Sequence, residues 1–258
     1  MSRQPLGQHF LVKGSALERI AGAACGESEP LVIEIGPGRG ALTERLATHA
    51  ERIIAIEIDA GLVERLREKF RSAAHVTILH ADARETDLNQ WGPAVIAGNL
   101  PYYIATPIIE KTLGTSFIQA VFLIQKEVAT RLAAAPGSRD YGYLSVRTQL
   151  FADVEKLFDI PPSAFHPPPK VDSTVVRLRP RNRAAELGIE NVERFLAFAS
   201  QCFRQKRKTL RNNLAGVYGK SALDGLPEAS KRAEELTLLQ FADLYRVLYH
   251  RDPGGQNA

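Results

Sequence analysis

The chain has 258 residues, of which 45% are hydrophobic and 24% charged, a composition typical of a soluble globular protein with one large domain or one large and one small domain. The net charge of +4 and the pI near 9.1 favour an anionic partner. No apolar stretch reaches the ~18 residues of a membrane span, and the first residues lack a signal-peptide pattern. We therefore expect a cytoplasmic protein with no membrane partner.

The cysteine and histidine content argues against a metal site. Cys25 and Cys202 lie far apart in helical-looking segments and lack the spacing of metal ligands. The six histidines are scattered along the chain. We expect no bound metal and two buried, unpaired thiols, as in a reducing compartment.

Strand and helix patterns alternate over the first 180 residues. The expected strands cover 31–35, 52–58, 75–79, 94–98, 120–124, 154–158 and 174–178. The expected helices cover 15–26 (with a capping box at Ser15 and Glu18), 41–50, 59–70 (capped by Asp59), a segment with Pro107 in its first position, 126–134 and 142–151. This alternation predicts an α/β fold with a mostly parallel sheet covered on both faces. Only the Pro-rich loop 159–173 joins the last two strands, so they are expected to pair antiparallel.

The composition changes at residues 179–183, and no strand pattern follows. The expected helices of this part cover 191–203, 204–218, 231–238 and 240–250. We therefore divide the chain into a ligand-binding α/β domain at 1–180 and a small all-helical domain at 184–258. Its last residues, 252–258, are expected to be disordered.

A glycine-rich loop, Gly36-Pro-Gly38-Arg-Gly40, follows the first expected strand and precedes a helix. Glycines at such a turn let the backbone approach a ligand closely. The GxGxG spacing differs from the GxGxxG of dinucleotide-binding folds, which serves a pyrophosphate, and so disfavours a dehydrogenase. With Glu34 two residues before the loop, the pattern suits a ligand without a phosphate.

Polar side chains stand at the ends of the next three expected strands, as Glu57, Asp82 and Asn99. In open α/β sheets, ligands bind at the carboxyl ends of the strands. Glu57 is placed to accept both hydroxyls of a ribose, and Asp82 is placed to accept the exocyclic amine of an adenine. A solvated loop carboxylate is the alternative for each acid alone, whereas the ordered series favours one binding site.

The tetrapeptide Asn99-Leu100-Pro101-Tyr102 suits a site that methylates the exocyclic amine of a base. That amine is a poor nucleophile, because its lone pair is delocalised into the ring. The side-chain oxygen of Asn99 and the carbonyl of Leu100 can accept its hydrogens and free the lone pair, in a turn stiffened by Pro101. Tyr102 can stack on the base, with Tyr103 as the alternative. A strand that merely stops at a proline turn is the other interpretation of the motif.

Together these features resemble the class I S-adenosylmethionine-dependent methyltransferases, in the branch that methylates amines. The resemblance implies a Rossmann-like sheet with an antiparallel last strand, and S-adenosyl-L-methionine as cofactor. The implied cofactor contacts are Gly36, Gly38 and Gly40 at the methionine part, Glu57 at the ribose, Asp82 at the adenine, and Asn99, which is assigned to both cofactor and substrate.

Three further segments resemble one family of this branch, the rRNA adenine N6,N6-dimethyltransferases of the KsgA type. The first is Leu6-Gly7-Gln8-His9-Phe10-Leu11. In the family this arm folds over the cofactor, which implies cofactor contacts for His9 and Leu11. The usual residue at position 9 is asparagine, and His9 can still form a hydrogen bond to the cofactor carboxylate. The alternative for His9 is a surface residue on a mobile terminus.

The second segment, residues 165–173, resembles the family's loop between the last two strands and implies that Phe165 stacks on the target base opposite Tyr102. The alternative is a Pro-rich connection with Phe165 in the core. The third segment, residues 203–214, resembles a basic helix whose charged face binds RNA phosphates, with a merely solvated face as the alternative. The implied RNA-binding residues are Arg204, Lys206, Arg207, Lys208 and Arg211.

The resemblance covers residues 5–250. It implies dimethylation of two adjacent adenosines in the 3′-terminal hairpin of the small-subunit (16S) rRNA, on an immature 30S-type subunit, during ribosome biogenesis. A large-subunit rRNA dimethyltransferase of the macrolide-resistance type shares the core, but the basic segment and the loop 165–173 favour the small-subunit enzyme.

Two further alternatives come from other classes. A catalytically silent RNA-binding assembly or transcription factor is disfavoured because Glu57, Asp82 and the tetrapeptide at 99–102 are intact. A small-molecule methyltransferase is disfavoured by the basic segment and the helical domain. No long apolar patch suggests an obligate dimer, so we expect a monomer.

Overall fold

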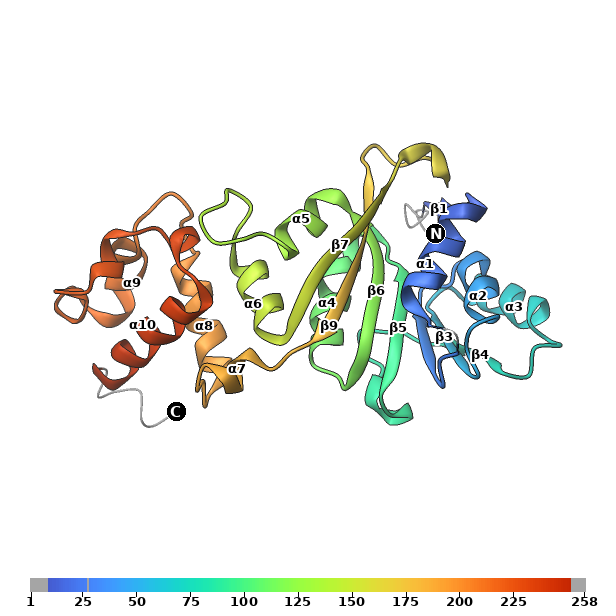
Figure 1. Cartoon of the computed structure of the whole chain (residues 1–258), viewed down its shortest axis with the longest axis horizontal. Helices are drawn as coiled ribbons and strands as arrows, with labels where there is room; N and C mark the ends of the chain where they lie inside the picture. The colour runs from blue at the N-terminus through green and yellow to red at the C-terminus, as the bar shows by residue number, and fades with distance from the viewer. Residues whose placement is uncertain (1–8, 27, 252–258) are drawn as a thin grey trace, which may run out of the picture. The chain divides into compact units, whose positions relative to one another are not determined.

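The structure, a computed structural model, describes residues 9–26 and 28–251. The described residues form two compact units (Figure 1). Each unit has its own hydrophobic core. The first unit contains the residues up to Ala129 together with Asp153–Pro180, and the second contains Thr130–Ala152 and the residues from Arg181 on. The arm residues 6–8 and the expected disordered tail 252–258 lie outside the described residues.

A seven-stranded sheet forms the centre of the first unit, in the order β4-β3-β2-β5-β6-β9-β7. Its strands are β2 (Val32–Ile35), β3 (Ile53–Glu57), β4 (Val76–His80), β5 (Ala94–Asn99), β6 (Phe117–Gln125), β7 (Ala152–Ile160) and β9 (Ser173–Pro180). Strands β2 to β6 pair in parallel, and β9 runs antiparallel to β6. The central strands have unbroken apolar sequences because both faces of the sheet are buried there. All seven strands occur where the sequence predicts them, and the mostly parallel sheet is confirmed.

Five helices belong to the sheet's connections. They are α1 (Gly14–Ala24), α2 (Ala41–Leu46), α3 (Ala60–Lys69), α4 (Ala105–Leu113) and α5 (Lys126–Leu132). α1 packs on β5, β6 and β9, α3 on β3 and β4, and α4 on β6. No described helix combines the length and the apolar character that a membrane crossing needs.

The expected helix caps are only partly correct. Asp59 caps α3 as predicted, accepting a hydrogen bond of 3.0 Å from the backbone amide of Leu62. The capping box at Ser15 is wrong, because α1 already begins at Gly14 and places Ser15 inside the helix. Pro107 is not the first residue of its helix either, since the short 3₁₀ turn η2 (Tyr102–Ile104) leads directly into α4.

The close approach of β5 to β2 sets the position of Asn99. A Cβ atom at Gly98 would lie 2.5 Å from the carbonyl oxygen of Ile35, a backbone atom that has no room to move aside. Glycine therefore allows the end of β5 to lie against the start of the glycine loop.

The second unit is built from helices. They are α6 (Tyr143–Phe151), α7 (Arg183–Glu186), α8 (Val192–Cys202), α9 (Leu210–Tyr218) and α10 (Leu238–Arg251), joined by the 3₁₀ turns η4 (Ser221–Leu223), η5 (Pro227–Ser230) and η6 (Ala233–Glu235). Its core contains the fully buried rings of Tyr141, Phe195 and Phe241. Where a helix is expected over 231–238, the chain forms only the turn η6.

The predicted division of the chain into two domains assigns one segment to the wrong domain. The boundary after Pro180 agrees with the structure, but residues 130–152, assigned to the first domain, belong to the helical unit. Val146 and Leu150 of α6 are buried in the same core as Phe195, which explains the difference. A helix between two strands has the same sequence pattern whichever core it joins.

The predicted basic helix begins later than expected. α8 ends at Cys202 and α9 begins at Leu210, so residues 203–209 form a connection. The buried carboxamide of Asn213 holds this connection, because its Nδ2 donates to the carbonyls of Cys202 at 2.7 Å and Gln205 at 3.2 Å, and its Oδ1 accepts from the Gln205 amide at 3.2 Å. Four of the five predicted RNA-binding residues lie in the connection, namely Arg204, Lys206, Arg207 and Lys208.

We expect Gly98→Ala to lower the free energy of unfolding by about 1–3 kcal/mol, because the added methyl group would overlap the Ile35 carbonyl. Gly114→Ala is the control, since its Cβ would meet its nearest neighbour at an ordinary 3.5 Å. Urea unfolding measures both variants, and equal losses in the two would contradict this account.

Candidate active site

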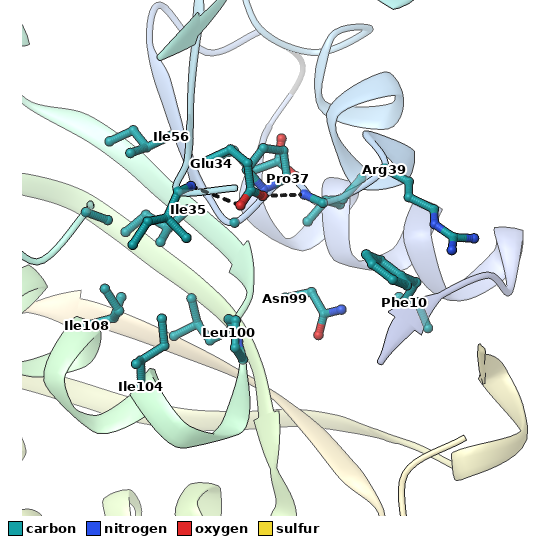
Figure 2. A pocket seen from close by; sticks show the side chains of 18 of the residues that line it. Phe10, Glu34, Ile35, Pro37, Arg39, Ile56, Asn99, Leu100, Ile104 and Ile108 are labelled. Atoms are coloured by element: carbon teal, nitrogen blue, oxygen red, sulfur yellow. Dashed lines mark hydrogen bonds between the residues drawn. The ribbon is translucent and has the colours of Figure 1, made fainter. Parts of the chain in front are cut away.

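A cavity of about 340 Å³ opens at the carboxyl ends of β2, β3, β4 and β5 (Figure 2). Its volume is in the range of small-molecule sites. The structure brings most of the sequence-predicted residues together in its lining, namely His9, Leu11, Gly36, Gly38, Glu57, Asp82, Asn99, Leu100, Pro101 and Tyr102. Gly40 and Phe165 do not line this cavity.

The glycine loop and the N-terminal arm close on each other. Gly36 and Gly38 adopt φ angles of +69° and +58°, which favour glycine. A Cβ atom at Gly38 would lie 3.0 Å from the ring of Phe10, so the missing side chain makes room for the arm. The Arg39 guanidinium lies 4.4 Å from the centre of the Phe10 ring, and Figure 2 shows the two side chains at the rim of the cavity.

Glu57 is 2% exposed and binds the backbone around it. Its Oε2 accepts a hydrogen bond from the Gly38 amide at 3.1 Å, and its Oε1 accepts from the amides of Ile58 and Asp59 at 2.9 and 3.0 Å. The carboxylate thus ties the glycine loop to the end of β3 and lies where the sequence predicts the ribose.

Glu34 is a second buried acid in the cavity wall and is 1% exposed. Burial, followed by the nearby charge of Glu57, raises the pKa of Glu34 to about 7. Its Oε2 has no hydrogen-bond partner among the described residues. The sequence marks Glu34 only as part of the loop motif and does not reveal its burial.

Asn99 ends β5 and lies between the glycine loop and the arm (Figure 2). Its Nδ2 donates to the backbone carbonyl of His9 at 3.2 Å. Because the amide nitrogen is held in this way, Oδ1 is fixed as the acceptor of the group. Pro101 follows with φ −57°, which stiffens the turn as predicted.

The two tyrosines that follow Pro101 differ in how firmly they are held. The Tyr102 hydroxyl forms a hydrogen bond of 2.8 Å with the Ser173 hydroxyl, and burial raises the pKa of Tyr102. Tyr103 is 58% exposed. Tyr102 is therefore the more firmly held of the two, and Ser173, which the sequence does not single out, orients its ring.

The Pro-rich loop contacts the arm. β1 (Phe10–Leu11) pairs antiparallel with β8 (Phe165–His166), and His9 Nδ1 donates to the Pro167 carbonyl at 2.8 Å. The His9 ring lies 5.6 Å from the Tyr102 ring, centre to centre. His9 therefore links the arm, the Pro-rich loop and Tyr102, and it also lines the cavity.

Phe165 does not take the expected position opposite Tyr102. Its side chain is 4% exposed and packs in the core of the first unit, where Leu11 and Ala164 also lie. The structure thus agrees with the alternative interpretation of this loop, in which Phe165 belongs to the core. The pairing of β8 with β1 turns the ring inward, and this pairing has no local signal in the sequence.

The basic segment lies in the helical unit and is mostly exposed. Arg211 differs from its neighbours, because its Nη2 forms an ion pair of 2.8 Å with Asp224 on the same unit. Lys206 Nζ donates to the Arg139 carbonyl. Arg204, Arg207 and Lys208 are exposed cations in the connection 203–209.

Cys25 and Cys202 are free and buried, as predicted. Burial raises the pKa of Cys25 to about 12 and raises that of Cys202 further. Neither thiol is placed to act as a nucleophile. No cluster of potential metal ligands occurs in the described part of the chain.

The lining of the cavity fits S-adenosylmethionine. The positive φ angles of Gly36 and Gly38 leave backbone open beside the cavity, and the orphaned Oε2 of Glu34 is an acceptor for a cationic ligand. Glu57 and Asp82 supply acceptors for hydroxyl and amino groups at the neighbouring strand ends.

Comparison with known proteins agrees with this site. The family model described as "Ribosomal RNA adenine dimethylase" matches residues 1–249. The chain belongs to this family. The expected fold, enzyme class and methyl donor, S-adenosyl-L-methionine, are thereby confirmed.

Individual relatives cover nearly the whole chain. "Ribosomal RNA small subunit methyltransferase A" of Acidobacterium capsulatum is 46% identical over 95% of this chain and 91% of its own length, and that of Koribacter versatilis is 41% identical over 94% and 93%. Among solved structures, a dimethyladenosine transferase from Plasmodium falciparum aligns with a TM-score of 0.80 at 27% identity, covering 94% of this chain and 98% of its own. The 23S rRNA methyltransferase ErmE aligns with a TM-score of 0.71 at 28% identity, covering 93% and 99%.

We expect the stability of the dimethylase to fall as the pH rises through 7, because Glu34 must then ionise in a buried site. A raised pKa favours the folded state while Glu34 is protonated, so the stabilisation present below pH ~4.5 is lost by pH 8. Relative to Glu34→Gln, the wild type should lose about 3 kcal/mol of unfolding free energy over this range. Urea unfolding at several pH values, with the exposed Glu64→Gln as control, measures it. Parallel pH profiles for wild type and Glu34→Gln would contradict this assignment.

Proposed function

We propose that this dimethylase transfers two methyl groups to N6 of each of two adjacent adenosines in the 3′-terminal hairpin of small-subunit rRNA, acting on an immature 30S-type subunit. The observation that carries the proposal is the side-chain amide of Asn99, which is held through Nδ2 by the His9 carbonyl and lines a cavity suited to the methyl donor. The relatives named as small-subunit methyltransferases support the choice of RNA.

The chain contributes positioning and activation of the amine. Bound S-adenosylmethionine supplies an electrophilic methyl group. In the first transfer, Asn99 Oδ1 and the Leu100 carbonyl accept the two hydrogens of adenine N6, which turns its lone pair toward the methyl donor. In the second transfer, one of these oxygens accepts the single hydrogen that remains. The methylated N6 cation is strongly acidic and releases its proton to water, so no strong general base is required.

Tyr102 holds the base from one face, because its ring is fixed by Ser173 and flanked by His9. A base must be unpaired or flipped out of a helix to enter such a cavity. Stacking on an aromatic ring is worth roughly 1–3 kcal/mol per base, which helps to offset this cost.

The residues that recognise the cofactor lie just past the carboxyl ends of consecutive strands. Glu57 accepts from the ribose, Asp82 from the adenine amine, and Gly36 and Gly38 border the methionine part. Leu11 closes the cavity from the arm. We place the RNA contact on the basic residues of the helical unit, and the protein works as a cytoplasmic monomer.

The function is tested with small ribosomal subunits from cells that lack this modification. Labelled methyl groups from S-adenosylmethionine should appear in N6,N6-dimethyladenosine at the 3′-terminal hairpin, read by mass spectrometry of the digested RNA. Methylation of naked large-subunit rRNA instead would assign the macrolide-resistance type of activity. Cofactor binding without any methyl transfer would favour a silent assembly factor.

In the same assay, Asn99→Ala should slow single-turnover methyl transfer by about 100-fold or more, because one of the two acceptors for the amine is lost. Affinity for S-adenosylhomocysteine should change much less. The control is Asn89→Ala, whose amide lies at the surface outside the cavity. An unchanged single-turnover rate in Asn99→Ala would rule out the activation mechanism.

The basic connection is tested by the double variant Arg207→Gln/Lys208→Gln. If both cations contact phosphates, subunit binding weakens and the slope of log K against log salt decreases by about 1 to 2. Arg65→Gln/Arg71→Gln, which removes two exposed cations of α3 and the turn after it, is the matched control. Equal salt slopes in all three proteins would exclude these phosphate contacts.

A further inference from the structure

Both oxygens of the Asp82 carboxylate are engaged by Arg84, two residues later in the chain. Arg84 Nε lies 3.1 Å from both oxygens of Asp82, Nη2 lies 2.5 Å from Oδ2, and the Arg84 backbone amide donates to Oδ1 at 2.9 Å. A carboxylate offers about four acceptor positions. Three donors of Arg84, with Nε shared between the two oxygens, make four contacts with this carboxylate.

The backbone of this turn is fixed, so any change must come from the Arg84 side chain. The amides of Glu85 and Thr86 donate to the Asp82 carbonyl at 3.1 and 3.0 Å, and the Thr86 hydroxyl donates to the same oxygen at 2.8 Å. The Arg84 side chain is 47% exposed, whereas that of Asp82 is 23% exposed. The guanidinium can therefore leave the carboxylate without disturbing the turn.

Arg84 also lies at the wall of the cavity together with Tyr103, the most exposed tyrosine of the tetrapeptide region. An adenine amine bound at Asp82 has to share a carboxylate whose two oxygens both accept from Arg84. A guanidinium displaced from Asp82 remains beside the cavity that a target base must enter, and its planar fork is well suited to phosphate.

We propose that the cofactor adenine and Arg84 compete for Asp82, and that the guanidinium displaced by the cofactor binds a phosphate of the RNA, so that cofactor binding strengthens RNA binding. The inference rests on the proposed function, because it takes Asp82 as the adenine site and RNA as the substrate. By linkage, RNA then strengthens cofactor binding by the same factor.

The two possible roles of Arg84, competing with the adenine or orienting Asp82, predict opposite changes in the cofactor affinity of Arg84→Gln. If Arg84 only orients Asp82, then Arg84→Gln weakens cofactor binding. If Arg84 competes with the adenine, then Arg84→Gln strengthens it. An exposed ion pair is weak, so the expected gain is about two- to fivefold.

The first experiment is calorimetric titration of the full-length protein with S-adenosylhomocysteine. Arg84→Gln should bind it about two- to fivefold more tightly than the wild type. The control, Arg71→Gln, removes a more exposed arginine that pairs with Glu68 outside the cavity and should bind like the wild type. Unchanged or weaker binding by Arg84→Gln overturns the proposal.

The second experiment measures co-sedimentation of the protein with unmethylated small subunits, with and without saturating S-adenosylhomocysteine. The wild type and Arg71→Gln should bind more tightly with the ligand, and the salt slope should rise by about one. Arg84→Gln should lose this gain. If Arg84→Gln keeps the full gain, the coupling is carried by other residues and the proposal fails.

The two failures can be told apart by the methyl-transfer assay. A wild type that forms dimethyladenosine in small subunits while Arg84→Gln keeps the coupling refutes only the role of Arg84. A wild type that binds S-adenosylhomocysteine but neither binds nor methylates small subunits refutes the proposed function, and with it the coupling.

Discussion

The buried carboxylate of Glu57 holds the cavity together. Three backbone amides, from the glycine loop and from the end of β3, converge on it, so one side chain fixes the loop against the neighbouring strand. Burial above all, and in smaller part the charge of this carboxylate, raises the pKa of Glu34 in the same cavity wall. With Glu57 ionised, a second negative charge on the buried Glu34 is unfavourable, as its raised pKa indicates. A cationic ligand nearby would make the ionisation of Glu34 less unfavourable.

The opposite wall comes from segments far apart in the chain. The backbone carbonyl of His9 fixes the amide of Asn99, while the His9 side chain reaches the Pro167 carbonyl. The first contact is independent of the side chain at position 9, and the second needs only a hydrogen-bond donor. The orientation of Asn99 is therefore independent of the side chain at position 9.

The sequence predicts the sheet and the cavity well because both follow from local rules. Apolar β-branched runs define the strands, and polar residues just past their carboxyl ends meet at one edge of a parallel sheet. The misplaced features depend on contacts between distant segments. Phe165 is turned inward by pairing with the arm, the connection 203–209 is set by the side chain of Asn213, and α6 joins a core whose other members follow residue 180. No periodicity within a short window carries this information.

The helical unit is assembled from two stretches of chain that are separated by strands β7 and β9 (Figure 1). It is therefore not an appendage that can be removed or exchanged by a single cut. A chain ending at Pro180 would keep α6 but lose its covering helices, leaving the apolar side chains of Val146 and Leu150 exposed to water. Any evolutionary exchange of this unit has to replace an internal segment and a terminal one together. Because its two stretches flank part of the catalytic sheet in the chain, the helical unit has to evolve together with that sheet.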